Sequence, residues 1–596
     1  MQWGRGKARL GNNLNLESQG FSEKALELFL EKLDSHRLLF TSSEVKSFRS
    51  EARHAWYHWL RSKRCEYFDQ WVTSHYSSAR ARFRKNLETS PLPKLSGKTD
   101  SEEDPQKRYP RFTGFAGDEK ELKTRLQSWL SQMASTTQPM VLEAYGGNLR
   151  YLLSDSLEQV LFESEPDARG ILAKAVLGSI DPYSTYFSPL EFEDFYHDLS
   201  AGTSGIGVKV RKVPDGLLVE KVITNSPAGR SGKMKEGQII TKVNKQKLAG
   251  VQSLMAKNLL KGDEGSPVAL ELQKSYKGKS FVVTITRKNY SFDEGRVSLR
   301  TIKAGKDKKS VAVIQIPSFY GRGGMTNFEQ ESSSSEDLHN IVEKLINQKE
   351  RPQALVLDLR GNPGGFLEEA VAMAGTFVGD RPVVEVVETE NRRILRDDQM
   401  KPLFTGALVL LTDQETASAS EVLAGALKDH QRAVLVGSQH TYGKGSVQKL
   451  FHLDDQMGLS GFAPVLGRGV VKLTTSVFYS PLGHTPANGG VRPHIILPEL
   501  EDKDSEDAPT LSFAIPEEKP FLDEVAMQDL KKNEVSFHPR VEALEMLSQK
   551  RRQALEKSDE SVEESWATTE AAWIANDLAS LEQDEIASNT KSQVSP

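Results

Sequence analysis

The sequence has one cysteine, no long apolar run and almost no excess of charge. With Cys65 as the only cysteine among 596 residues, no disulfide can form within the chain and no cysteine cluster can hold a metal. No apolar run approaches the roughly 18 residues needed to cross a bilayer, and the first residues lack the apolar segment of a secretory signal. We therefore expect no transmembrane segment in this chain.

The charge balance argues against a nucleic-acid partner. The formal net charge is only −5, so the chain offers no strongly basic surface to displace the counterions of phosphates. An apolar fraction of 38% and a charged fraction of 27% are typical of a globular chain rather than a disordered one. The length exceeds what one hydrophobic core supports, which predicts several domains.

The periodicity of apolar residues changes along the chain. Three- and four-residue spacing, as in Leu26, Phe29 and Leu33, predicts helices in the first part. Short β runs separated by glycine turns follow beyond Ala201, and apolar strands then alternate with helical stretches until about Pro498. The sequence thus predicts a multidomain α/β protein with a helical N-terminal domain at 1–197, a β-rich module at 198–290, an α/β core with parallel strands at 291–500, and a helical extension at 501–596 whose last twenty residues are disordered.

Continuous apolar segments in the core are typical of buried parallel strands joined through helices. They lie at residues 311–316, 354–359, 407–411 and 433–436. Ligands of such sheets bind at the carboxyl ends of the strands, where helices begin. Glycine- or serine-rich loops follow three of these strands, at residues 360–365, 412–421 and 437–448. We expect these loops to share one edge of the sheet and to form the functional site.

Ser418 stands where a predicted strand gives way to a helix. Its hydroxyl would lie near free amide hydrogens and the positive end of the helix dipole, which favours an alkoxide or an oxyanion. This placement suits acyl transfer. Ser418 and Glu421 also spell a capping box, so a purely structural helix cap is the alternative.

Lys444 stands between two glycines, where the backbone can bend sharply and leave the amine facing a cleft. It can act as a base only if burial lowers its pKa toward neutrality, and a solvated lysine in a turn is the alternative. A phosphate-binding loop is excluded, because Gly437 is one residue too far from Gly443 and because Gly445 follows the lysine. We therefore expect no nucleotide site.

Backbone amides near Ser418 are candidates for an oxyanion hole. Gly364 and Gly365 could donate N–H groups, with Ala419 as a second source, although either glycine could equally serve the geometry of the turn. Gln448 follows Lys444 by four residues on a strand-like segment. It would point to the same face and could orient the amine, while a surface glutamine is the alternative.

Five ordered motifs carry a family resemblance. They are DPYSTYFSP at 181–189, RGNPGG at 360–365, SASE at 418–421, YGKGSVQ at 442–448 and TPANGGVRP at 485–493. Together they resemble the carboxy-terminal processing proteases, and most closely the large periplasmic tail-specific proteases of bacteria. The resemblance runs from about Gly20 to Pro539, and the ordered co-occurrence of the motifs is far more specific than any one of them.

The resemblance implies a Ser–Lys hydrolase without metal or cofactor, in which Ser418 attacks the peptide carbonyl and neutral Lys444 takes its proton. It also places Asp429 with the pair. Eleven residues along one helix separate Asp429 from Ser418 by roughly 16 Å, so a structural role is the physical alternative. The loop before the lysine is one residue longer than is usual in the family and contains His440, which leaves a Ser–His pair as a minor alternative.

The β-rich module resembles a PDZ domain. Its loop Gly205, Ile206, Gly207 and Val208 is similar to the carboxylate-binding turn, whose amides receive a C-terminus while the peptide adds as a strand. An ordinary hairpin turn is the alternative.

The resulting hypothesis is an ATP-independent serine endopeptidase that selects proteins or peptides with exposed apolar C-termini. The resemblance further implies a periplasmic location and leaves room for an adaptor protein as a partner. The alternative function is a catalytically inactive PDZ scaffold or peptide-binding adaptor, against which the intact Ser418, Lys444 and Gln448 argue.

Overall fold

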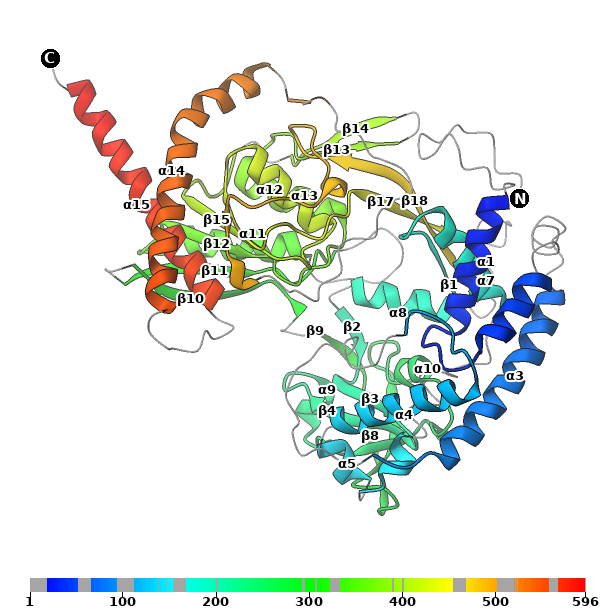
Figure 1. Ribbon diagram of the computed structural model, residues 1–596. Helices are drawn as coiled ribbons and strands as arrows, with labels where there is room; N and C mark the ends of the chain where they lie inside the picture. The colour runs from blue at the N-terminus through cyan, green and yellow to red at the C-terminus, as the bar shows by residue number, and fades with distance from the viewer. Residues whose placement is uncertain are drawn as a thin grey trace.

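The segments predicted as buried strands form the centre of a six-stranded sheet (Figure 1). All neighbouring pairs in this sheet are parallel except β10 and β11. In spatial order the strands are β10 (Ser298–Ala304), β11 (Lys309–Gln315), β12 (Ala354–Asp358), β15 (Ala407–Thr412), β16 (Val434–Gly437) and β19 (Ile495–Ile496). The prediction of an α/β core with parallel strands is confirmed.

The structure is a computed structural model. It describes residues 19–51, 66–93, 112–137, 139–145, 147–153, 168–199, 202–291, 295–305, 308–321, 333–388, 391–398, 401–453, 468–500, 519, 521–522, 524–556 and 566–594.

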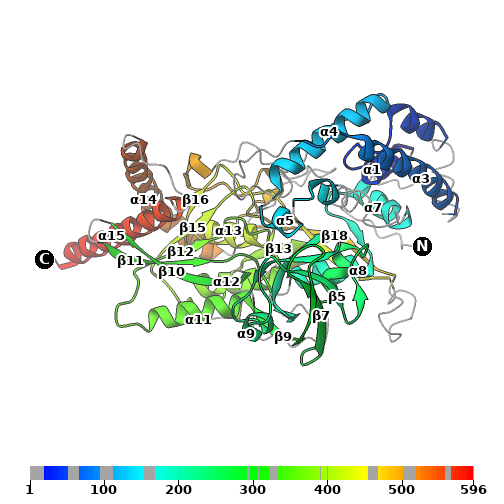
Figure 2. The same cartoon turned by 90° about the horizontal axis from the view of Figure 1, so that it is seen from below.

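Helices cover both faces of the six-stranded sheet (Figures 1 and 2). Successive side chains of a strand point to opposite faces, so Leu355 and Leu357 of β12 pack on one side and Val356 on the other. The first side is covered by α11 (Ser334–Ile346), α12 (Leu367–Val378) and α13 (Ala419–Asp429). The second is covered by α15 (Trp566–Val594), with α14 (Glu524–Glu556) packed beside it.

The C-terminal helices differ from the prediction in two respects. We expected helix from about Pro539 and disorder in the last twenty residues, whereas α14 begins at Glu524 with Pro539 inside it and α15 runs to Val594. The disorder prediction rested on the place of these residues at the terminus and missed the spacing of small residues. Alanines at four-residue intervals form the buried stripe of α15, namely Ala567, Ala571, Ala575 and Ala579.

A second, antiparallel sheet joins the core to the helical N-terminal region. Its order is β1-β18-β13-β14, and β17 also pairs with β18. The strands are β1 (Thr185–Phe187), β13 (Val384–Val387), β14 (Arg392–Leu395), β17 (Ser446–His452) and β18 (Val470–Tyr479). In the pairing of β1 with β18, Thr185 lies opposite Lys472. The segment with the DPYSTYFSP motif is thereby fixed against the core.

The N-terminal region is helical, as predicted. Its helices are α1 (Gln19–Leu33), α3 (Glu66–Thr89), α4 (Glu119–Thr136), α5 (Pro139–Ala144), α7 (Ala168–Ile180) and α8 (Pro189–Leu199). Trp129 and Phe29 are fully buried in a hydrophobic core of their own. A separate cluster joins Tyr145 of this region to Leu218 and Ile239 of the following β-rich module, so the two parts pack together.

The β-rich module is an antiparallel sheet flanked by short helices, as expected for a PDZ-like fold. The order is β3 (Val208–Val213), β4 (Gly216–Val222), β5 (Ile239–Val243), β7 (Pro267–Gln273) and β8 (Ser280–Thr286), with β6 (Gln246–Lys247) beside β5. The short helices are α9 (Pro227–Ser231) and α10 (Ser253–Asn258). Strands β2 (Gly202–Gly205) and β9 (Lys288–Ser291) pair where the chain enters and leaves the module.

The predicted boundaries of the four domains stay predictions.

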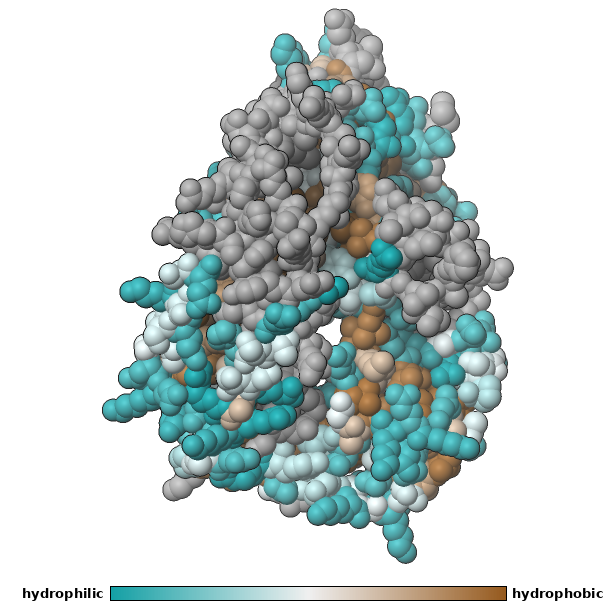
Figure 3. All heavy atoms as spheres, turned by 90° about the vertical axis from the view of Figure 1, so that its right-hand side faces the viewer, coloured by the Kyte–Doolittle hydropathy of each residue, from teal (hydrophilic) through white to brown (hydrophobic). Residues whose placement is uncertain are grey.

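The helices of the described part of the chain are not suited to crossing a membrane. None of its helices combines the length and the apolar character that crossing a bilayer requires. On the face seen in Figure 3, the described residues are mostly hydrophilic, with separate apolar patches between the polar side chains.

Candidate active site

Ser418 is the N-cap of α13, directly after β15 and the loop that follows it. Its φ of 58° and ψ of −114° lie in a region that non-glycine residues rarely occupy. Such strain persists only where surrounding contacts enforce it, and it is common at functional sites. The residue is half-buried at the positive end of the helix. Ser418 therefore does cap the helix, but an ordinary helix cap does not require these φ and ψ values.

The glycine-rich loop after β12 touches Ser418. A Cβ at Gly364, whose φ is 102°, would lie 2.8 Å from the Ser418 Cβ. The Gly364 N–H donates to the Asn362 Oδ1 at 2.8 Å and is therefore occupied. Gly365, with φ of 146°, and Ala419 at the first turn of α13 donate no such bond among the described residues, so their N–H groups can bond to a ligand.

Buried Asn362 holds the two loops together, a role that the sequence analysis missed. Its carbonyl accepts from the Ala417 N–H at 2.9 Å and from the Ser420 hydroxyl at 3.1 Å. Its side-chain amide donates to the Ile316 carbonyl at 2.8 Å. The position of Gly365 relative to Ser418 is thus set by bonds from one fully buried side chain and its backbone.

Lys444 lies in the loop between β16 and β17 and is half-buried. Burial, assisted by the nearby Lys472 ammonium, lowers its pKa from 10.5 to about 8, although Glu421 and Asp181 act in the opposite direction. Its Nζ is 5.3 Å from the centroid of the Tyr183 ring. Among the described residues, no hydrogen bond joins this Nζ to the Ser418 hydroxyl.

Glu421 connects the serine loop to the lysine loop. Its Oε2 accepts from the backbone N–H of Ser418 and from that of Lys444, each at 2.8 Å. Its Oε1 accepts from the Thr441 hydroxyl at 2.6 Å and from the Gly443 N–H at 2.7 Å. Burial raises the pKa of this carboxyl, and the four donated bonds oppose that rise. The sequence analysis assigned Glu421 a capping role only, because the bonds to the lysine loop depend on tertiary structure.

Comparisons with known proteins decide the family. Residues 310–497 match the model of peptidase family S41. This segment, the α/β core of the chain, belongs to that family. In addition, residues 15–190 match the tail specific protease N-terminal domain, and residues 197–273 match the PDZ domain. The family resemblance stated from the sequence motifs is confirmed.

Curated relatives of this S41 peptidase chain include two processing proteases. A tail-specific protease of Haemophilus influenzae is 33% identical over 339 residues, 56% of this chain and 46% of that protein. Carboxy-terminal processing protease CtpA of Bacillus subtilis is 27% identical over 351 residues, 58% of this chain and 68% of that protein. The chain thus spans about half the length of the first relative. A photosystem II D1 C-terminal processing protease covers 62% of this chain and 95% of its own at 23% identity, with a TM-score of 0.32, too low to carry an argument.

In this S41 chain, Gln448 does not contact the lysine amine. Its Nε2 donates to the Ser446 hydroxyl at 3.0 Å and lies 3.3 Å from the Thr474 hydroxyl. The Thr474 hydroxyl in turn donates to the Asp181 carboxylate at 2.8 Å. The register of β17 shifts between Val447 and Gln448, so the four-residue spacing from the lysine does not place both side chains together.

Two further candidates make other contacts. Asp429 ends α13, at the opposite end from Ser418, and its Oδ2 accepts from the Leu482 N–H at 2.8 Å. It therefore fixes the turn after β18, in line with the structural alternative. The Nδ1 of His440 lies 2.8 Å from the Thr441 carbonyl, which engages that ring nitrogen.

The predicted carboxylate-binding loop lies between β2 and β3 of the PDZ-like module. Gly207 has φ of 76°, and a Cβ there would lie 1.9 Å from the Ser226 Cβ. The carbonyls of the loop are used internally, because Ala228 N–H donates to the Ile206 carbonyl and Ile223 N–H to the Gly207 carbonyl. The carbonyls of Ile206 and Gly207 are therefore engaged within the module.

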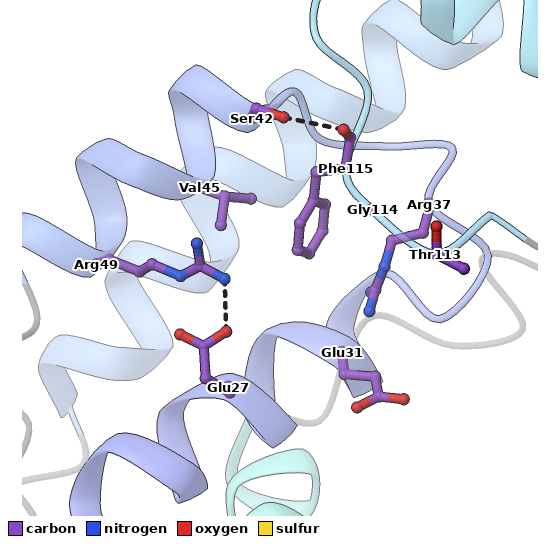
Figure 4. A pocket seen from close by; sticks show the side chains of 9 residues that line it. All are labelled: Glu27, Glu31, Arg37, Ser42, Val45, Arg49, Thr113, Gly114 and Phe115. Atoms are coloured by element: carbon purple, nitrogen blue, oxygen red, sulfur yellow. Dashed lines mark hydrogen bonds and ion pairs between the residues drawn. The ribbon is translucent and has the colours of Figure 1, made fainter.

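One cavity of the molecule is unrelated to these residues. It has a volume of about 370 Å³ and lies among the N-terminal helices (Figure 4). Arg49 forms an ion pair with Glu27 at its wall, and Arg37 stacks on Phe115. The charges of its lining compensate each other, and it contains none of the predicted site residues.

Proposed function

We propose that this S41 peptidase is an ATP-independent endopeptidase that uses a Ser418–Lys444 acyl-enzyme mechanism and selects substrates by their C-terminal tails. One observation carries the proposal. The strained serine and a lysine with a lowered pKa are held by a single buried carboxylate, that of Glu421. A structural cap and a solvated lysine would need neither the strain nor the shared acceptor.

In the proposed reaction, the Ser418 Oγ attacks the peptide carbonyl while the neutral Lys444 amine takes the hydroxyl proton. The negative charge that develops on the carbonyl oxygen is stabilised by the N–H groups of Gly365 and Ala419. The lysine, now an ammonium, gives its proton to the leaving amine. Water then attacks the acyl-enzyme with the same lysine as base. The first step requires the Lys444 side chain to turn from the Tyr183 ring toward Ser418, as catalytic contacts often tighten only when substrate binds.

We further propose that the loop at residues 205–208 binds the substrate's terminal carboxylate and that the tail adds as a strand beside β3. The flanking apolar side chains Ile206 and Val208 favour apolar tails. A periplasmic location and an adaptor protein as a partner are proposals that rest on the family alone.

Cleavage of a loosely folded protein tests the mechanism. Ser418→Ala and Lys444→Ala should each abolish cleavage, whereas Lys449→Ala, which changes an exposed lysine close by, should leave it intact. Full activity in either of the first two variants refutes the assignment. For tail selection, removal of the last residues of the substrate should raise KM, and an unchanged KM refutes that part.

The competing function, an inactive PDZ scaffold, predicts a different outcome. Such a protein would bind tailed peptides but leave them intact even at a pH well above the lowered pKa of Lys444, and Ser418→Ala would change nothing.

A further inference from the structure

Tyr183 reaches the candidate active site from a distant part of the sequence. It follows helix α7 of the N-terminal region, and the strand β1 that begins two residues later pairs with β18 of the core. This pairing brings the Tyr183 ring to 5.3 Å from the Lys444 Nζ. A residue outside the matched S41 segment at 310–497 therefore forms part of the wall around the lysine.

Buried hydrogen bonds hold the Tyr183 turn in place. The Asp181 Oδ1 accepts from the N–H groups of Tyr183 at 2.9 Å and of Ser184 at 3.0 Å. The same oxygen accepts from the Thr474 hydroxyl of β18 at 2.8 Å, and Asp181 itself is 1% exposed. Movement of the turn's backbone away from the core would break bonds to a buried carboxylate, which is costly. The turn is therefore a fixed support for the ring.

We propose that Tyr183 is a positioning residue for the general base: its ring excludes water from the Lys444 amine and so favours the uncharged amine that a base requires. The inference rests on the proposed function, because only a base needs an uncharged amine. The phenol itself stays protonated, since burial raises its pKa.

The ring has two opposing effects on the amine. Its face attracts an ammonium, which favours the charged form, and its bulk removes water, which favours the neutral form. Burial by all the surrounding groups is the largest cause of the lowered pKa of Lys444, and the ring is one of the groups that surround the amine. A ring centroid 5.3 Å away also lies near the outer limit of a strong cation–π contact.

Three other charged groups act on the amine. Glu421 of α13 and Asp181 favour the ammonium, whereas Lys472 of β18 disfavours it. Lys472 is itself held over the rings of Phe187 and Phe195, at 5.4 and 5.3 Å from their centroids. None of these groups is altered by a change at Tyr183, so the contribution of the ring can be measured separately.

The test compares Tyr183→Ala with Tyr183→Phe in the full chain, with kcat/KM for a cleavable peptide measured from about pH 6 to pH 10. Activity should rise with pH as the lysine loses its proton. In Tyr183→Ala the midpoint of that rise should move up by about one pH unit, with roughly tenfold lower activity at pH 7 and recovery at high pH. Tyr183→Phe keeps the ring and should keep the wild-type midpoint. Tyr186→Ala, in the same segment, is the matched control and should also keep it.

A readout independent of cleavage separates this inference from the proposed function. In a Ser418→Ala background, the reactivity of the Lys444 amine toward acetic anhydride, followed by mass spectrometry across pH, should report a midpoint near 8 that Tyr183→Ala raises. If the wild type cleaves no peptide, the proposed function fails while this titration still decides the effect of the ring. If Tyr183→Ala does not fold, as its Tm would show, Tyr183→Leu takes its place, with a smaller rise expected.

Two results would overturn the inference. An unchanged midpoint in Tyr183→Ala, even with a lower rate, would mean that the ring does not act through the amine. A shift in Tyr183→Phe as large as that in Tyr183→Ala would assign the effect to the hydroxyl instead.

Discussion

The backbone nitrogens of Ser418 and Lys444 share one acceptor, the Oε2 of Glu421, at 2.8 Å from each. The two loops that carry the serine and the lysine therefore cannot move apart without leaving a buried N–H unpaired. This bond pair sets the backbone geometry on which the proposed proton transfer depends.

Replacement of Glu421 by glutamine should disrupt this geometry. An amide offers one acceptor oxygen in place of two, so at least one buried N–H loses its partner, at a cost of about 1–3 kcal/mol. We expect a lower Tm and a fall in kcat of about a hundredfold, because small misplacements of reacting groups cost that much. Glu415→Gln, at an exposed position of the same loop, should change neither quantity. Wild-type kcat and Tm in Glu421→Gln would contradict the role of the shared acceptor.

Replacement of Lys444 by methionine should stabilise the fold at neutral pH. The pKa of Lys444 is about 8 in the folded state against 10.5 ordinarily, so below pH 8 the folded chain carries a charge that burial disfavours by about 3 kcal/mol. This cost shrinks between pH 8 and 10.5 and disappears above. Lys444→Met should therefore raise Tm at pH 7 and much less at pH 10.5, whereas exposed Lys449→Met should not. An equal gain at both pH values would show that the charge is not the cause.

Much of the fold follows from local patterns, whereas the site depends on contacts that no local pattern contains. The apolar runs at 354–359 and 407–411 predicted β12 and β15, and the strand-to-helix change at Ser418 predicted its cap position. Nothing near Tyr183 indicates a contact with Lys444, because that contact arises from the pairing of β1 with β18. The motif at 181–189 was informative only through its resemblance to a family.

Gly364 of the glycine-rich loop can be compared with Gly489, which lies outside that loop and has nearly the same φ. Gly364 and Gly489 have φ of 102° and 104°, but an added Cβ meets the Ser418 side chain at the first and nothing within 4 Å at the second. Both alanine variants share the backbone strain, whereas only Gly364→Ala pushes on the serine. We expect Gly364→Ala to lose at least about a hundredfold in kcat and Gly489→Ala to retain most activity. Equal losses would attribute the effect to strain alone.

The PDZ-like module allows a similar pair of variants. Gly207 and Gly237 have φ of 76° and 80°, and only at Gly207 would a Cβ collide, with Ser226. Gly207→Ala should deform the carboxylate-binding loop and raise KM for a tailed substrate about tenfold, with kcat retained. Gly237→Ala should keep the wild-type KM. Steady-state kinetics with substrates that have or lack the tail measure this, and a fall in kcat with unchanged KM would contradict a role of the loop in tail binding.

Identification of the covalent intermediate tests the central claim most directly. The enzyme would be mixed with a peptide substrate, quenched in acid during turnover, digested and analysed by mass spectrometry. We predict an acyl group of the substrate's N-terminal fragment on the peptide that contains Ser418, and none in Ser418→Ala or in Lys444→Ala. An adduct on another residue would contradict the account. Cleavage by Ser418→Ala at the wild-type rate would contradict it as well.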